Sequence, residues 1–354
     1  MAGTARRPVA LGIDIGGTAT RVLAVDAAGR RRGAGRSAGA NPTAHPPAAW
    51  SRALSEALAQ ALDEAGPGAE VTSVVVGVAG DQALAVGDAA ATFERVIRGR
   101  AGAGCPIRIT GDVVVAFAAG TPAADGTVLV AGTGAAAAAI RDRAPAAEID
   151  GYGWLLGDAG SGFWIGRQAV RAALADLDGR GPATRLRPLV TDALLGRGFA
   201  DANPRQLCLE IVNAAHARPP VALSRLAPLV SRCTADGDEV ALRIATAAAG
   251  HLVASVLAVR PTRAATPLVV TGGVAAGSHP IAALLGERLE DRWPGCVRAV
   301  PDGVAGAAWL ALIAMPGADQ GESAGLHRII TAAPDHHGRA GSSRPRRAIT
   351  AAPG

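Results

Sequence analysis

A strand, a short glycine turn and a second strand follow one another twice in this chain, and this repeat limits the possible folds more than any other feature. The first unit covers residues 9–25, with its turn at 16–18, and the second covers residues 127–140, with its turn at 132–134. Apolar runs on both sides of a short glycine turn predict a hairpin. We therefore expect two similar lobes, each built on its own sheet.

The length of 354 residues is sufficient for two domains, each with a core of its own. Apolar strand patterns alternate with helical ones, which predicts an α/β protein with a mixed sheet flanked by helices in each lobe. We expect an N-terminal lobe at 1–118 and a C-terminal lobe at 119–315, whose last helix, near 305–313, packs back toward the first lobe. Gly, Ser, Pro and Arg dominate residues 316–354, which predicts a disordered tail.

Periodicity predicts the other main elements. Leucines at 54, 58 and 62 have the four-residue spacing of a helix, expected at 48–65. Short apolar runs bounded by turn residues predict buried strands at 74–78, 107–109 and 268–271.

The basic residues exclude several mechanisms. All 35 of them are arginines, so the chain has no Walker-A lysine, no protein-kinase lysine and no lysine for a Schiff base. The formal charge of +5 and the pI near 9.8 come from scattered arginines that are not interleaved with aromatic residues. This pattern indicates a solvated surface, and no nucleic-acid partner is expected.

Cysteine spacing and hydropathy narrow the class of protein further. The four cysteines lie far apart and form no CxxC pair, which argues against a metal cluster or a disulfide framework. The most apolar stretch, 244–259, contains glycine, histidine and serine, and we interpret it as a buried helix without a membrane span. Asp14 ends the first apolar run too early for a secretory signal, so a cytoplasmic location is expected.

The first glycine turn has the chemistry of a phosphate site. Gly16 and Gly17 let the backbone approach a triphosphate and offer it N–H donors, and Thr18 can add a hydroxyl. Asp14, at the end of the strand, is placed to hold Mg²⁺ through water, because this ion keeps most of its hydration shell. The alternative is an ordinary Gly-Gly hairpin.

The second turn, at Gly132, Thr133 and Gly134, has the same chemistry, although by itself it is equally consistent with a plain turn. Two such turns at matching places predict an ATP site between the lobes. Gly272 and Gly273, after the strand at 268–271, are candidates for contact with the adenosine portion.

Asp112 is the candidate catalytic base. It follows the strand at 107–109 directly, and phosphorylation of a hydroxyl needs a group that accepts the proton while the oxygen is aligned with the γ-phosphate. The alternative is an aspartate that only caps the helix beginning near Val113.

A glycine-rich loop at residues 151–164 is the candidate sugar site. Glycines such as Gly151 let the backbone approach a ligand, Tyr152 offers a flat apolar face, and Asp158 offers an acceptor. The alternative is a structural loop that packs its aromatic rings into the core. Asn41 and Asp81 are weaker candidates for substrate contact, since polar residues at strand ends are often turn or cap residues.

These motifs together resemble the N-acetylglucosamine kinase branch of the BadF/BadG/BcrA/BcrD ATPase family, within the actin/hexokinase superfamily. The resemblance covers residues 9–315 and is carried by GIDIGGT, ITGD, LVAGTG, GYGWLLGDAGSGFW and VVTGG. It implies a two-lobed actin-like, ribonuclease H-like fold and the cofactors ATP and Mg²⁺. It also implies a sugar substrate, with the 6-phosphate of N-acetylglucosamine or of a related amino sugar as the product.

Residue by residue, the resemblance implies a nucleotide held by Gly17, Thr18 and Thr133, and a base at Asp112. It assigns the sugar contacts to these residues: Asn41, Asp112, Tyr152 and Asp158.

Three positions depart from the family pattern. Ala135 replaces a usual Ser, Ala159 a frequent Glu, and Tyr152 a common Trp. Each lost ligand contact could weaken binding by about 1 to 3 kcal/mol. Three further functions stay open: a glucosamine kinase, an ATPase that activates a partner enzyme, and a non-catalytic sensor of sugar or nucleotide. The oligomeric state is open as well, with a homodimer as one option.

Overall fold

The protein is described here from a computed structural model, in which residues 6–42, 45–80, 88–196, 203–316 and 323–332 are placed. Asp81 lies outside these described residues. Five strands form the first sheet, in the order β3-β2-β1-β4-β5: β1 (Arg7–Ile15), β2 (Ala19–Asp26), β3 (Arg31–Ala38), β4 (Ala69–Val78) and β5 (Ile107–Gly111). The strands β1, β2 and β3 pair antiparallel, and β4 and β5 run parallel to β1.

The second sheet repeats this arrangement in the order β8-β7-β6-β9-β10. Its strands are β6 (Gly126–Ala131), β7 (Ala135–Arg141), β8 (Ala144–Asp150), β9 (Leu268–Thr271) and β10 (Val297–Val300). Again three strands form an antiparallel meander and two run parallel to its first strand. The predicted α/β fold of two similar lobes, each with a mixed sheet flanked by helices, is confirmed.

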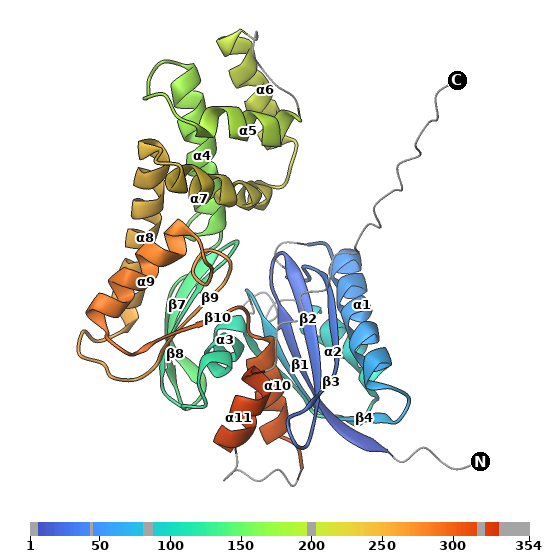
Figure 1. Ribbon diagram of the computed structural model, residues 1–354. Helices are drawn as coiled ribbons and strands as arrows, with labels where there is room; N and C mark the ends of the chain where they lie inside the picture. Colours follow the sequence, from blue (N-terminus) through green and yellow to red (C-terminus); the bar gives the residue numbers. More distant parts are fainter. Residues whose placement is uncertain (1–5, 43–44, 81–87, 197–202, 317–322, 333–354) are drawn as a thin grey trace, which may run out of the picture.

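Two helices lie between the sheets. They are α3 (Asp112–Gly120) and α10 (Val304–Ile313), while α1 (Pro47–Ala65) and α2 (Ala89–Ala101) cover the outer face of the first sheet (Figure 1). The alternation of β1 explains this layering, because Leu11 and Ile13 face the core of α1 whereas Ala10 faces that of α3 and α10.

Small residues allow α10 to lie directly on the first sheet. A Cβ on Gly12 of β1 would overlap the backbone of Ala308, and one on Gly306 would overlap the Val115 carbonyl of α3. Glycine and alanine thus allow close packing at this layer, which the two sheets share. The proposed lobe boundary at 118/119 falls inside α3 and stays a prediction.

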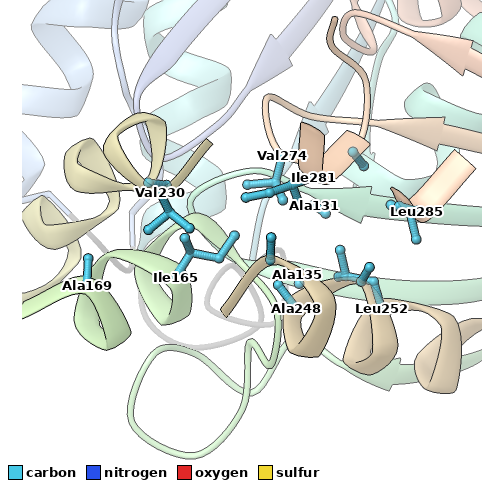
Figure 2. Packing of buried hydrophobic residues seen from close by; sticks show 14 of the residues in the cluster. Ala131, Ala135, Ile165, Ala169, Val230, Ala248, Leu252, Val274, Ile281 and Leu285 are labelled. Atoms are coloured by element: carbon cyan, nitrogen blue, oxygen red, sulfur yellow. The ribbon is translucent and has the colours of Figure 1, made fainter. Parts of the chain in front are cut away.

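Helices cover the outer face of the second sheet and extend beyond it (Figure 1). They are α4 (Gly162–Leu177), α5 (Leu186–Leu195), α6 (Pro204–His216), a 3-10 helix (Pro220–Leu226), α7 (Ala227–Ala235), α8 (Glu239–Val259) and α9 (Pro280–Arg292). Figure 2 shows Ala131 and Ala135, which flank the second glycine turn, packed among side chains of α4, α8 and α9.

The helix α8 contains the apolar stretch 244–259. By length and hydropathy it is the one helix of the described residues that could cross a membrane. Six of its residues, including Ala245, Leu252 and Val256, are buried in the core of the second lobe, as in a helix packed on a sheet.

The expectation of disorder throughout 316–354 is wrong at one place. Ser323–Thr331 forms the helix α11, whose residues His327 and Ile330 are buried. The Trp309 indole N–H of α10 donates to the Ser323 carbonyl (2.9 Å), and His327 Nε2 donates to the Ala118 carbonyl of α3 (2.8 Å). Composition misled the prediction because a few apolar residues at helical spacing are enough to dock one short helix.

Candidate active site

The predicted site residues lie where the parallel strands of each sheet end. Asp14 and Asp112 lie at the carboxyl ends of β1 and β5, which both run parallel to β4. Gly132 and Gly272 follow β6 and β9, which run parallel to each other. Because the carboxyl ends of parallel strands share one edge of a sheet, each lobe gathers its candidates at one edge, the usual place for a ligand in α/β proteins.

The two edges meet at Asp14. Its Oδ2 accepts the N–H of Gly303 (3.2 Å), which lies between β10 of the second sheet and α10. The Arg21 guanidinium lies 3.9 Å from Asp14 Oδ2 through Nη1 and 2.9 Å from Asp302 Oδ2 through Nε. A single cluster, largely buried, thus joins the first strand of one sheet to the segment after the last strand of the other.

Burial dominates the electrostatics of this cluster. It raises the pKa of Asp14 to about 6, with a further raising effect from the neighbouring Asp302, while Arg21 and the Gly303 amide oppose this. Two carboxylates face one guanidinium, so the cluster carries one net negative charge when fully ionised. This is the charge that a hydrated divalent cation would compensate.

A histidine from the segment after β3 forms a hydrogen bond with the first glycine turn. The ring nitrogen Nε2 of His45 lies 2.9 Å from the Gly17 carbonyl oxygen and donates to it. Since the peptide unit is planar and trans, the following N–H, that of Thr18, points the opposite way. The backbone of Gly39 also packs on this peptide, because a Cβ there would overlap the Gly17 carbonyl.

The second glycine turn is held by α4. The N–H groups of Gly162 and Phe163 donate to the carbonyls of Gly132 (2.7 Å) and Thr133 (3.1 Å). The same planarity directs the N–H groups of Thr133 and Gly134 away from α4. These two donors are therefore aligned on one side of the turn, as a polyphosphate would require.

The candidate sugar loop is in contact with this second turn. Asp158 Oδ1 accepts the N–H of Ala135 (3.1 Å), and a Cβ on Gly134 would lie 3.0 Å from the Asp158 carboxylate. Burial raises the pKa of Asp158, the Ala135 amide lowers it, and Asp150 raises it. Gly151 has φ 73° and donates its N–H to the Ala135 carbonyl, whereas the Tyr152 side chain is 70% exposed.

The turn at Gly272 and Gly273 lies against the second glycine turn. A Cβ on Gly272, which has φ 95°, would overlap the Ala131 carbonyl, and Val274 N–H donates to that carbonyl (2.9 Å). His279 Nε2 donates to the Gly273 carbonyl (2.9 Å), while its Nδ1 accepts the N–H of Ala282 at the start of α9 (3.3 Å). The second glycine turn, the candidate sugar loop and the turn at Gly272 and Gly273 thus lie next to one another in the second lobe.

Asp112 is the first residue of α3 and is half-buried. The residue that caps this helix is Gly111, and no side chain provides a cap hydrogen bond. Asp112 therefore occupies the first helical position and not the capping position, and its role as the base stays a prediction. Asn41 follows β3 and is half-buried, and its carbonyl accepts the N–H of His45 (3.1 Å), so it lies in the segment that holds the first turn.

Three glycines of the candidate site have open space beside the backbone. A Cβ on Gly17, Gly132 or Gly273 would meet no atom of the described residues within 4 Å, and none of the three has a positive φ. Neither packing nor backbone conformation within the described chain therefore requires glycine there. Room for a ligand that approaches the backbone is a physical reason for all three.

Sequence reasoning missed four residues that shape this site: Arg21, His45, Asp150 and Asp302. Arg21 could have been found, because the hairpin register places it directly opposite Asp14. Asp302 lies just before a predicted helix, where an aspartate is usually interpreted as a helix cap, so its sequence position did not indicate a site residue. His45 and Asp150 carry no local signal, since their partners are defined only by the folded loops.

Comparisons with known proteins agree with these features. The sequence profile of the BadF/BadG/BcrA/BcrD ATPase family matches residues 11–311. The N-acetylmuramic acid/N-acetylglucosamine kinase of Clostridium acetobutylicum is 31% identical over 153 residues, which are 43% of this chain and 48% of that protein. The N-acetyl-D-glucosamine kinase of Dictyostelium discoideum is 29% identical over 217 residues, which are 58% and 65% of the two chains.

This chain therefore aligns with about half to just under two thirds of the length of these two relatives. Among solved structures, a candidate N-acetylglucosamine kinase from Chromobacterium violaceum superposes with a TM-score of 0.65 at 23% identity, covering 87% of this chain and 99% of that one. At this identity the superposition shows a shared fold.

Proposed function

Because this chain belongs to the BadF/BadG/BcrA/BcrD ATPase family, we propose that it transfers the γ-phosphate of ATP to a sugar hydroxyl. N-acetylglucosamine is the favoured acceptor and its 6-phosphate the product. The names of the two relatives support an amino sugar substrate. The observation that carries the proposal is the contact of Asp14 with Gly303, which brings the phosphate-type turn of one lobe to the ligand edge of the other.

The nucleotide side of the site is assigned to backbone donors and one acid. Gly17 and Thr18 of the first turn, and Thr133 and Gly134 of the second, offer N–H groups to the phosphates. The N–H of Gly16 donates to the Ala19 carbonyl (2.9 Å), so Gly16 closes the turn and does not offer this donor to phosphate. Gly132 gives the second turn its open side, and Gly272 and Gly273 lie at the adenosine. Asp14 would hold Mg²⁺ through water, and the Mg²⁺ complex of ATP supplies the phosphoryl group with its charge partly neutralised. Since the chain has no lysine, this compensation is assigned to the backbone turns and the ion, with Arg21 as the nearby positive side chain.

The acceptor side is assigned to Asp112 and the sugar loop. Asp112 would accept the proton of the attacking hydroxyl, a role for which a half-buried carboxylate at a helix start is suited. Asn41, Gly151, Tyr152 and Asp158 would contact the sugar, and Asp158 connects this group to the second glycine turn. Asp81, outside the described residues, stays a proposal from sequence.

The direct test offers purified protein ATP and Mg²⁺ with one sugar at a time and follows ADP release. The panel is N-acetylglucosamine, glucosamine, N-acetylmannosamine and glucose. ADP release that depends on N-acetylglucosamine supports the proposal, and dependence on glucosamine alone supports a glucosamine kinase. ADP release without any sugar points to an ATPase, and ligand binding without turnover points to a sensor, the function that Ala135 and Ala159 favour.

The base assignment predicts the effect of Asp112→Asn. Turnover should fall by about 10² to 10⁴-fold, the usual range for loss of a general base, with ATP affinity almost unchanged. Steady-state kinetics measure the turnover, and ATP titration measures the affinity for ATP. Unchanged turnover would remove Asp112 from the mechanism.

A role as an activator ATPase has less support than a role as a sugar kinase. An activator that carries an iron–sulfur cluster needs clustered cysteines, and no group of three or more metal-ligating side chains occurs within the described ranges. We place the reaction in the cytoplasm, with a small-molecule sugar as the partner.

A further inference from the structure

The carboxylate of Asp150 ties together the two ends of the candidate sugar loop. Asp150 is the last residue of β8, and its Oδ1 accepts the N–H of Asp158 (2.6 Å) while its Oδ2 accepts the N–H of Ala159 (2.9 Å). Residues 151–157 form the loop between these ends. One side chain thus fixes where the loop leaves the sheet and where it returns.

Both ends of the loop have an unusual backbone. Asp150 has φ 66° and Asp158 has φ 58°, the left-handed region that non-glycine residues rarely adopt. Such conformations persist only where surrounding contacts impose them. The two short hydrogen bonds to Asp150 are contacts of this kind, because they hold the peptide on each side of the Asp158 Cα.

The position of the backbone decides where the Asp158 side chain points. Its Oδ1 accepts the Ala135 N–H (3.1 Å), and its carboxylate lies against Gly134 of the second glycine turn. The Cβ position of Gly157 is occupied by Asp150 Oδ1, so the loop also closes tightly on the other side. A chain of contacts therefore runs from Asp150 through Asp158 to the turn.

A carboxylate at position 150 is not the easiest way to stabilise a loop. It lies close to a second carboxylate, that of Asp158, and like charges at short range repel. What a carboxylate provides is two acceptor oxygens for two successive N–H groups at once. This geometry selects one orientation of the 158–159 backbone, and with it one direction for the Asp158 side chain.

We propose that Asp150 is a positioning residue for the acceptor sugar, which orients Asp158 by holding its backbone. The inference rests on the proposed function, in which Asp158 contacts the sugar. It concerns a residue that does not itself reach the substrate. Because Asp158 would contact the sugar equally in the ground state and the transition state, loss of the two Asp150 hydrogen bonds should raise the KM for sugar and leave kcat nearly unchanged.

Two variants separate this role from simple stabilisation. Asp150→Gly removes both acceptors and relieves the left-handed strain, so the chain should still fold. We expect its KM for sugar to rise at least about tenfold, with kcat and the KM for ATP each within about threefold of wild type. Asp150→Asn keeps one acceptor oxygen and should raise the KM for sugar by a smaller factor.

Asp142→Gly is the matched control. Asp142 follows β7, at the other end of the β7–β8 hairpin from Asp150, also has a positive φ (50°), and is exposed. The substitution therefore changes the same residue type in the same backbone region away from the site. Its kinetic constants should equal those of wild type. An unchanged KM for sugar in Asp150→Gly, or an equal rise of both KM values, would overturn the inference.

A readout without catalysis keeps the inference separate from the proposed function. Amide hydrogen exchange at residues 158 and 159 should be at least about tenfold faster in Asp150→Gly than in wild type, and unchanged in Asp142→Gly. If wild type phosphorylates no sugar but exchange behaves in this way, the proposed function fails while the backbone-holding role of Asp150 stands. Unchanged exchange in Asp150→Gly removes that role whatever the activity.

Discussion

At the scale of single residues, Asp14 combines a functional position with a cost in stability. Its carboxylate is buried between β1 and the start of α10, beside Asp302, and its pKa is raised to about 6 from 3.8. A shift of this size corresponds to about 3 kcal/mol of differential interaction. Groups that stabilise ligands are often held in environments that disfavour their own charge.

The sign of this effect gives a prediction for the ligand-free protein. Between pH of about 4 and 6 the folded state binds more protons at Asp14 than the unfolded state, so this contribution to stability falls as pH rises and is absent above pH of about 6. Asp14→Asn keeps an acceptor for Gly303 and removes the charge. It should therefore unfold at a higher temperature than wild type at pH of about 8, with a smaller difference at pH of about 4.5.

The difference in unfolding temperature between Asp14→Asn and wild type is measured by thermal unfolding without metal, at these two pH values and at pH of about 6. Asp142→Asn, at an exposed position, is the control. The same Asp14→Asn variant should lose at least about 100-fold in kinase activity, because the proposed magnesium ligand is gone. A lower unfolding temperature for Asp14→Asn than for wild type at the highest pH would contradict the electrostatic argument.

Glycines in open space allow a second prediction at this scale. Gly17→Ala and Gly132→Ala place a methyl group where no described residue lies within 4 Å, so unfolding temperatures should stay within about 1 °C of wild type. The KM for ATP should rise about tenfold or more, because the methyl group occupies the space through which phosphate would approach. Gly99→Ala in α2, which also has open space, is the control and should not change the KM.

At the scale of elements, α11 shows how a short C-terminal segment is recruited to the core. It follows the part of the chain that matches the family profile, which ends at residue 311. His327 is buried, donates to the Ala118 carbonyl and packs edge-on against Trp309, with ring centroids 5.1 Å apart. The opposite end of α3 begins with Asp112, so α11 supports the helix that carries the proposed base.

His327 makes this docking sensitive to acid. Burial lowers the pKa of its imidazole, so the folded state favours the neutral ring and the stability it contributes is lost as pH falls below the ordinary histidine range. His327→Gln keeps a donor for Ala118 and cannot titrate. The fall in unfolding temperature between pH of about 7.5 and about 5 should be smaller in this variant by about 2 °C or more.

Differential scanning fluorimetry across this range, with His216→Gln in α6 as control, measures the difference. Equal pH dependence in His327→Gln and wild type would mean that His327 has the same pKa in the folded and unfolded states, and would contradict this argument.

At the scale of the whole molecule, the duplicated sheet explains why one ligand could be held from two sides. Each lobe presents a glycine turn at its ligand edge, and α3 and α10 occupy the layer between the sheets. The described contact between the edges runs through Asp14, Arg21 and the 302–303 segment.

We therefore expect closure of the lobes when ATP and the sugar bind together, because water in the site would otherwise compete for the γ-phosphate. Small-angle scattering should give a smaller radius of gyration with a non-hydrolysable ATP analogue and sugar than with either ligand alone. Equal radii in all states would exclude closure as part of the mechanism.

Local chemistry by itself determined the two glycine-turn hairpins and the most apolar strands. Apolar runs broken by Gly16 and Gly17, and again by Gly132 and Gly134, were sufficient to predict both hairpins, because strand and turn preferences act over a few residues. The strands β3, β8 and β10 escaped prediction. Arg31–Ala38 and Ala144–Asp150 lack a strongly apolar face, and their pairing comes from the neighbouring strand.

Only the tertiary structure decided which residues meet across long stretches of sequence. Asp14 and Gly303 are 289 positions apart, and His45 holds Gly17 through a hydrogen bond that no local pattern encodes. In the sequence Asp150 carries no signal beyond its place at the end of residues 144–150, and the return of the loop places two N–H groups on its carboxylate. Hydrogen bonds between distant segments depend on how the layers of the fold pack. Residue type and spacing therefore indicate candidate site residues, and only the folded structure determines which of them are in contact.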